Sequence, residues 1–172
     1  MDKTILITRL LNARDDWEQL INHVSSKRAG GISGAWLVRN SIAHVMVHEQ
    51  YAADRLGELS HGEVFIPCQT QETLEAFIEE YGYPDFESPL MSVEAADEWV
   101  SQKYRNVEMR ELIASELQAF DGILSQVRVL SESQLNEPGM IGRIASATLD
   151  RYRRHGAEIR GRFKHLVLRS GE

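Results

Sequence analysis

The chain has 172 residues, of which 42% are hydrophobic and 26% are charged. This composition is typical of a globular protein and excludes a disordered one, and the length suits a single domain with its own core. Nineteen Lys and Arg residues against 26 Asp and Glu residues leave a formal net charge of −7. Such a surface repels phosphate backbones, and the basic stretch at 151–164 would spread its charges around a helix, so we expect no nucleic-acid partner.

The cysteine content and the hydropathy bear on the compartment. Cys68 is the only cysteine, so no disulfide can form within the chain, and a reducing compartment is expected. Charged residues interrupt the N-terminal stretch, and no segment reaches the roughly eighteen apolar residues of a membrane span. We therefore expect a cytoplasmic protein with no membrane partner and a buried, unreactive thiol at Cys68.

The first half of the chain has the hydrophobic spacing of two long amphipathic helices. The pattern predicts a first helix over about 2–25, a glycine-rich break at 27–34 and a second helix over about 37–60. The middle of the second helix is apolar almost all round. Such a helix is either central in a bundle or also covered by a partner subunit.

Residues 62–92 are less regular. The stretch at 70–82 predicts a short amphipathic helix that Gly82 and Pro84 stop, and a loop follows it. A connection this long inside a small domain is often functional, as a lid or pocket wall, but it can equally be a packing cover. Both alternatives stay open at this point.

A third helical region begins near Val93, breaks near Asn106 and continues over 107–130. Its apolar residues again recur at spacings of three and four, so that Leu117 is expected in the core. No segment of the chain shows the alternation of a β-strand.

The last helix is predicted over about 140–168, after a turn at 131–140. Four amphipathic helices and no strand predict an all-α protein, a four-helix bundle that forms one domain over residues 1–172. The connection between the second and third long helices carries the short extra helix.

Three polar residues lie inside the apolar second helix. His44 and His48 are one turn apart on the same side, where imidazoles can share a metal if another helix offers a third ligand. Glu49 falls within the apolar stripe, so its carboxyl group must be hydrogen-bonded, paired or protonated. The simplest expectation is that Glu49 pairs with an arginine of the last helix.

Two residues of the last helix could meet this cluster. His155 lies on the core stripe, where it could face His44 across the bundle. Arg151 is one turn earlier on nearly the same side, where it could hold an anion or pair with Glu49. A hydrogen-bonded core histidine and a solvated arginine are the corresponding structural alternatives.

Three segments resemble the second, third and fourth helices of the DinB/YfiT-like superfamily, and the ClbS/DfsB type is among the branches they resemble. They are GAWLVRNSIAHVMVHE, KYRNVEMRELIASELQAFDGILSQVRVLSESQL and TLDRYRRHGAEIRGRF. The resemblance implies an up-down-down-up four-helix bundle that is often a dimer. It also implies a zinc or nickel ion on one histidine of the second helix and two of the fourth.

On this resemblance His44 and His155 occupy two of the metal-ligand positions, and Arg151 stands at the third. Arginine stays protonated and does not coordinate a cation. Either His48 or Glu49 supplies the missing ligand, or the metal is lost and Arg151 forms an anion site. In the second case His44 or His155 is a proton-transfer group. We favour the metal-free alternative, because Arg151 repels a cation.

The expected function is therefore that of a DinB-like protein with a small-molecule pocket between the helices at 37–60 and 140–168. The resemblance implies a hydrolase or a thiol-dependent transferase with a degenerate metal site. The candidate catalytic residues are His44, Glu49, Arg151 and His155, and the candidate metal ligands are His44, His48 and His155. The alternatives are a non-catalytic ligand-binding or self-protection protein, for stress or resistance, and a purely structural helical homodimer. Whether the chain is an enzyme stays open.

Overall fold

The computed structural model describes residues 1–26 and 31–169, except the side chains of residues 26, 31–33 and 164–169. The described part is helical and contains no strand, which confirms the predicted all-α class. None of its helices is long and apolar enough to cross a membrane. The helices are α1 (Lys3–Ser26), α2 (Gly31–Ser60), α3 (Gln71–Tyr81), α4 (Val93–Tyr104), α5 (Met109–Val129), α6 (Glu132–Leu135), α7 (Met140–Ala147) and α8 (Leu149–Arg169).

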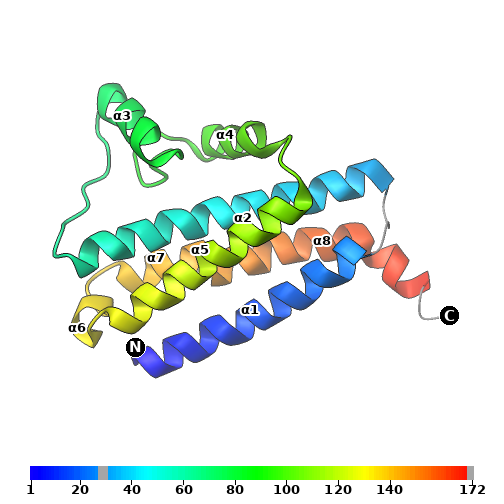
Figure 1. The fold of residues 1–172 in the computed structure, drawn as a ribbon, viewed down its shortest axis with the longest axis horizontal. Helices are drawn as coiled ribbons and strands as arrows, with labels where there is room; N and C mark the ends of the chain where they lie inside the picture. The colour runs from blue at the N-terminus through cyan, green and yellow to red at the C-terminus, as the bar shows by residue number, and fades with distance from the viewer. Residues whose placement is uncertain (27–30, 170–172) are drawn as a thin grey trace.

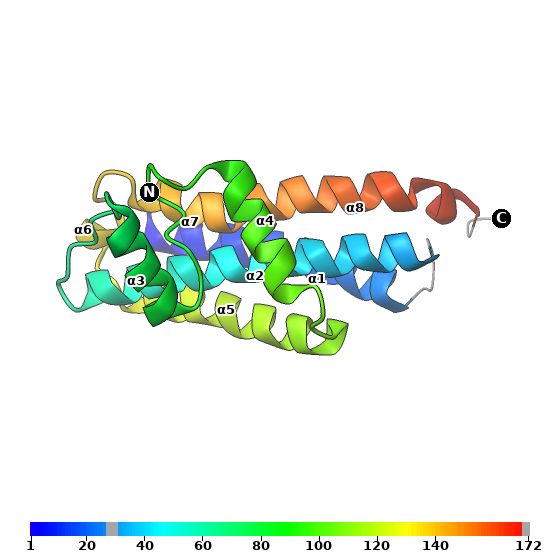
Figure 2. The ribbon, with the colours of Figure 1, turned by 90° about the horizontal axis from the view of Figure 1, so that it is seen from above.

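The long helices α1, α2 and α5 and the α7–α8 pair lie side by side (Figure 1). In this view α1 and α7–α8 run from left to right, and α2 and α5 run from right to left. Helix α2 packs most extensively on α5 and also contacts α1, α4, α7 and α8. The helices α3 and α4 lie over α2, as the view from above shows (Figure 2).

The central place of α2 explains its apolar middle. Every side chain from 41 to 49 is buried, including the polar ones. Neighbouring helices of the same chain therefore cover all sides of the middle of α2. Large side chains that are almost fully buried, such as Leu10, Ile42 and Ile159, form the core around it. Each stabilises the fold by ~1.5–3 kcal/mol through its removal from water.

One residue that the sequence pattern places in the core is exposed in the structure. Leu117 of α5 is 45% exposed, so the expectation that it is buried is wrong. Leu117 lies at the edge of a groove between α1 and α5, where the two helices make few contacts. The spacing of apolar residues shows which face of a helix is apolar, but not how far a neighbouring helix covers that face.

The ends of α3 follow from local chemistry. Thr70 and Thr73 form a capping box at its start, each side chain bonding the backbone N–H of the other residue. Gly82 ends the helix with φ of 77°, a conformation that side chains other than glycine rarely adopt. The short helix predicted over 70–82 is confirmed, and so is the break near Asn106 between α4 and α5.

Three predicted boundaries differ from the structure. The last helix is not continuous, because Thr148 (φ −120°, ψ −83°) separates α7 from α8 and its hydroxyl group donates to the Ile144 carbonyl at 2.7 Å. Such bonds from a threonine side chain compete with regular helix geometry. The turn predicted at 131–140 contains the short helix α6, and α2 begins at Gly31 rather than near 37. Part of the predicted glycine break, residues 27–30, lies outside the described residues.

An aromatic cage fixes α3 on α2. The guanidinium carbon of the buried Arg55 lies 4.5–5.0 Å from the ring centroids of Tyr51, Phe65, Phe77 and Tyr81. Arg55 Nη2 also lies 2.8 Å from Glu58 Oε1. The aromatic faces and this single carboxylate stabilise the buried charge. This part of the 62–92 segment is a packing cover.

Asp85 anchors the loop that follows α3. Its buried carboxylate accepts hydrogen bonds from the Tyr51 hydroxyl at 2.7 Å and the Cys68 backbone N–H at 2.8 Å. The Ser88 hydroxyl donates to the Cys68 carbonyl at 2.6 Å. Burial and the neighbouring Asp85 raise the pKa of the Cys68 thiol, so it is protonated and unreactive near neutral pH. The loop is therefore held in one place beside α2.

Candidate ligand-binding site

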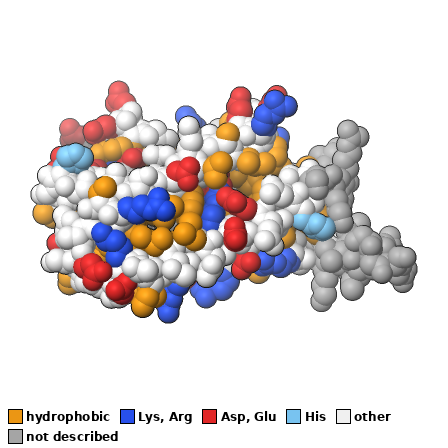
Figure 3. Space-filling model, turned by 60° about the horizontal axis from the view of Figure 1, so that its bottom comes forward, with side chains coloured by type: hydrophobic (Ala, Val, Ile, Leu, Met, Phe, Trp, Pro, Cys, Tyr) orange, Lys and Arg blue, Asp and Glu red, His pale blue; other side chains and the backbone are white. Residues whose placement is uncertain are grey.

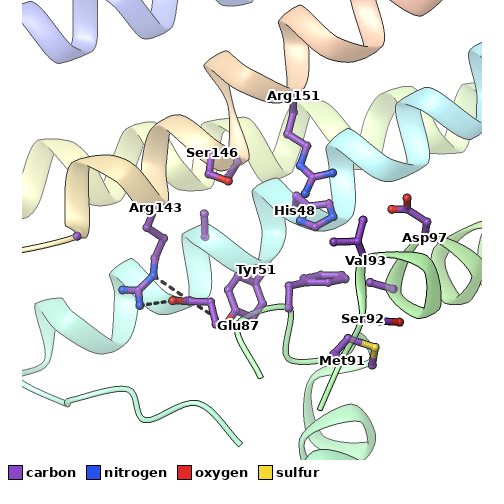
Figure 4. Close-up of a pocket in the computed structure, with 15 residues that line it drawn as sticks. His48, Tyr51, Glu87, Met91, Ser92, Val93, Asp97, Arg143, Ser146 and Arg151 are labelled. Atoms are coloured by element: carbon purple, nitrogen blue, oxygen red, sulfur yellow. Dashed lines mark hydrogen bonds and ion pairs between the residues drawn. The ribbon is translucent and has the colours of Figure 1, made fainter. Parts of the chain in front are cut away.

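A cavity of about 290 Å³ lies between α2, α4, α7, the start of α8 and the loop before α4 (Figure 4). Its apolar walls come mainly from Phe86, Met91, Val93, Ala96 and Ala147. The end of the 62–92 segment is thus a pocket wall, while α3 is a cover. The polar groups that line the cavity belong to His48, Tyr51, Glu87, Ser92, Asp97, Arg143, Ser146 and Arg151.

The two arginines of the cavity differ in their partners. Arg143 donates to both carboxylate oxygens of Glu87, at 2.9 Å and 2.8 Å, so these two charges neutralise each other. Arg151 is half-buried and makes no hydrogen bond or ion pair with any residue that the structure describes. Burial and then Arg154 lower the pKa of Arg151, but a guanidinium keeps its proton in proteins. Arg151 is therefore a cation at the cavity wall that has no hydrogen-bond or ion-pair partner among the described residues, although the charges of Asp97 and Asp150 act on it from a distance.

His48 lies beside Arg151 in the cavity (Figure 4). Its ring centroid is 4.1 Å from that of Phe86. Burial, followed by the charge of Arg151, holds the pKa of His48 well below its usual value, so the imidazole is neutral near neutral pH. A neutral imidazole has one donor and one acceptor nitrogen, so His48 can orient a polar ligand without adding charge.

His44 and His155 do face each other, as the sequence predicted, with ring centroids 5.7 Å apart. His44 Nε2 lies 3.2 Å from Ser101 Oγ. His44 Nδ1 and both ring nitrogens of His155 are buried without a hydrogen-bond partner among the described residues, although Asp97 Oδ1 lies 3.7 Å from His44 Nδ1 and Glu158 Oε2 lies 3.4 Å from His155 Nδ1. Burial lowers the pKa of both residues, that of His155 to about 3, with further lowering by Arg151. Both imidazoles are neutral, and neither lines the cavity.

The metal ion that the resemblance implies does not fit the residues present. His44 and His155 have unpaired nitrogens, but Arg151 adds a positive charge beside them. Zinc sites in proteins use at least three protein ligands. Within the residues that the structure describes, no three His, Cys, Asp or Glu side chains lie close enough together to hold a metal ion. His48, the expected substitute, lies against the ring of Phe86 instead.

Glu49 lies apart from the cavity, in a separate buried network. Its Oε2 accepts a hydrogen bond from the Tyr152 hydroxyl at 2.6 Å and lies 3.7 Å from Arg14 Nη1. Arg14 donates to both carboxylate oxygens of Glu116. The expectation that Glu49 pairs with an arginine of the last helix is therefore wrong, because its cationic neighbour is Arg14 of α1.

The ionisation of this network follows from its burial. Burial, together with the charge and hydrogen bonding of Glu116, raises the pKa of Glu49 well above its usual value. For Arg14, burial alone would lower the pKa, but the hydrogen bonds and charge of Glu116 raise it overall. The environment of Glu49 therefore favours its protonated form, beside the buried Arg14–Glu116 pair. Of the four candidate catalytic residues, Arg151 alone reaches the cavity.

The sequence did contain a signal for the Arg14–Glu116 pair. Arg14 is spaced four residues from Leu10 and three from Trp17, on the apolar stripe of α1, and both neighbours are buried. Glu116 falls at the same kind of position on α5, four residues before Phe120. Opposite charges on the apolar stripes of two helices indicate a buried ion pair.

We compared the chain with protein-family models, with curated proteins and with solved structures, and none of the three comparisons found a match. The function is therefore inferred from the cavity and its side chains.

Proposed function

We propose that the chain is a DinB-like four-helix bundle protein that binds a small anionic molecule in the cavity between α2, α4 and α7–α8. The observation that carries this proposal is the Arg151 guanidinium, which faces the cavity without a partner among the described residues. A half-buried cation loses part of its hydration, so a carboxylate or phosphate group that pairs with it restores the lost interaction.

The other groups of the cavity suit the same ligand. Glu87 and Arg143 neutralise each other, and Asp97 lies 3.9 Å from the nearest nitrogen of Arg154. His48 is neutral beside Arg151. An anionic group on Arg151 would therefore have a donor within reach on His48 or Ser146, while the rest of the ligand packs on the apolar wall.

The fold and the family are part of the proposal. In chain order, α1 runs one way, α2 and then α5 run the opposite way, and α7–α8 runs in the direction of α1. This order supports an up-down-down-up bundle. The segments around His44, 103–135 and 148–163 carry the resemblance to DinB/YfiT-like proteins.

Binding, rather than turnover, is the step that the cavity supports. Glu49 is on the far side of α2, and His44 and His155 do not line the cavity. A general base works best with a pKa near neutrality, whereas the pKa of His48 is far lower. Hydrolase and transferase activity, and a homodimer, stay predictions of the resemblance.

NMR titration with benzoate, and with its neutral isostere benzamide, tests the proposed site. We expect benzoate to bind at least tenfold more tightly than benzamide, with shifts in residues around Arg151 and His48. Arg151→Met should weaken benzoate binding at least tenfold, because the charge-assisted hydrogen bonds are lost.

Arg153→Met is the matched control, since Arg153 is on the same helix with its side chain 79% exposed. It removes the same charge without touching the cavity. Equal affinity for benzoate and benzamide, or equal losses in the two variants, would contradict the proposal.

A further inference from the structure

A second cavity, of about 220 Å³, lies in the groove between α1 and α5, on the other side of the molecule from the first. Ile42 of α2 forms part of its floor, and Ile21, Ile113 and Leu117 form apolar walls. Figure 3 shows a face of the molecule on which hydrophobic side chains gather in a central band between acidic and basic ones. We name this cavity the α1–α5 groove.

Three charged side chains line the α1–α5 groove. Arg14 donates through Nε to Glu18 Oε1 at 2.9 Å, and its two terminal nitrogens donate to Glu116. One guanidinium therefore meets two carboxylates, which leaves a net charge of −1. The side chains of Arg14 and Glu116 are 6% and 4% exposed, so both lie at the base of the groove.

The uncompensated negative charge lies at the mouth. The Glu18 side chain is 42% exposed, and among the described residues its second oxygen, Oε2, has no hydrogen-bond partner. Both oxygens of Glu116, by contrast, accept from Arg14. A cation entering the groove would therefore meet Glu18 first, beside the exposed part of Leu117.

We propose that the α1–α5 groove binds a small hydrophobic cation, namely an amine with an aromatic or branched alkyl body. Its ammonium group pairs with Glu18 Oε2 at the mouth, and its apolar body packs on Ile21, Ile113 and Leu117. The volume suits a single small molecule, and the charge of the groove is complementary to a cation. This site is independent of the anion site around Arg151.

The probe is phenethylamine, which is an ammonium ion at pH 7, compared with 3-phenylpropionate, an anion of similar shape. In NMR titrations of the full chain we expect phenethylamine to bind at least fivefold more tightly. The resonances that shift should belong to residues around Ile113 and Leu117, and not to those around Arg151.

Glu18→Gln keeps the size of the side chain and removes its charge, and should weaken phenethylamine binding at least fivefold. Asp15→Asn makes the same charge change on an exposed part of α1 and should leave the affinity unchanged. Leu117→Asn removes apolar surface from the exposed wall and should also weaken binding of both probes.

Four results would overturn the proposal. They are an absence of binding at millimolar phenethylamine, equal affinity for the two probes, and equal effects of Glu18→Gln and Asp15→Asn. The fourth is a concentration-dependent shift of the Leu117 resonances without ligand, together with dimer in sedimentation, because a second copy would then cover the groove.

Discussion

The polar side chains on the two sides of α2 have different surroundings. His48 and Glu49 are adjacent in the chain, but His48 lines the cavity and Glu49 joins the buried Arg14–Glu116 pair. On α8 the adjacent residues Arg151 and Tyr152 divide in the same way, with Arg151 at the cavity and Tyr152 bonded to Glu49. Successive residues of a helix point about 100° apart, so one turn of each helix serves both sides.

The two sides of α2 differ in how completely their buried polar groups are hydrogen-bonded. On the Glu49 side the Tyr152 hydroxyl donates to Glu49 Oε2 and Arg14 donates to both oxygens of Glu116, so that in this network Glu49 Oε1 alone has no hydrogen-bond partner among the described residues. On the cavity side Arg151 has no partner among the described residues, and three buried ring nitrogens of His44 and His155 have none either. Satisfied buried groups stabilise one structure, whereas unpaired groups indicate where a ligand or water completes the bonding.

The largest expected difference comes from the same substitution on the two sides. Arg14→Met should lower the free energy of unfolding by ~3–5 kcal/mol, because it leaves Glu116 buried without its cation. Arg151→Met should change it by less than ~1 kcal/mol, since no described group loses a partner. Urea denaturation of both variants measures the two values.

Comparable losses of stability in Arg14→Met and Arg151→Met would contradict the contrast between the sides. A double variant, Arg14→Met with Glu116→Leu, sharpens it. Removing both charges should recover much of the stability lost in Arg14→Met, because hydrophobic residues of similar size often replace a buried ion pair at little cost.

The next largest expected effect is the pH dependence of the unfolding free energy that His155, on the cavity side of α2, confers. The pKa of His155 is about 3 in the folded protein, below the ordinary value of 6.5, because burial and the neighbouring His44 and Arg151 disfavour its charged form. Its contribution to stability is therefore full above pH 6.5 and is lost as the pH falls from 6.5 towards 3. His155→Gln should reduce the slope of unfolding free energy against pH in this range by up to ~1.4 kcal/mol per pH unit.

Chemical denaturation at a series of pH values between 7 and 4 measures this slope. Glu49 acts in the opposite direction, since its raised pKa makes protonation stabilising, and that stability is lost as the pH rises through its folded-state value. An unchanged slope in His155→Gln would show that His155 is not held neutral in the folded protein.

The sequence was sufficient where the deciding interactions are local. The short helix at 70–82 depends on the capping residue Thr70 and on Gly82, both of which are visible in the chain. The break at Thr148 was missed because a threonine inside a helical pattern predicts no break by itself. In the structure the Thr148 hydroxyl bond to the Ile144 carbonyl accompanies the break between α7 and α8.

The candidate site was less predictable, because its interactions cross the fold. Burial of Glu49 follows from the helical period, but its partners come from α1 and α8, and no local pattern identifies them. Arg151 was identified through its helical spacing from His155 and through the family resemblance, but its lack of a partner among the described residues is visible only in three dimensions. Leu117 shows the same limit, since the spacing of apolar residues does not reveal the α1–α5 groove.

The smallest expected effect tests the single hydrogen bond that joins α8 to the Glu49 network. Tyr152→Phe removes the hydroxyl that donates to Glu49 at 2.6 Å and leaves a buried oxygen without this donor. We expect the free energy of unfolding to fall by ~1–3 kcal/mol. Tyr104→Phe is the control, because burial alone raises the pKa of Tyr104 and no bond to its hydroxyl contributes. It should cost less than ~0.5 kcal/mol. Equal costs for the two changes in urea denaturation would mean that the Tyr152–Glu49 bond adds nothing, and that Arg14 and Glu116 alone hold the Glu49 side of α2 together.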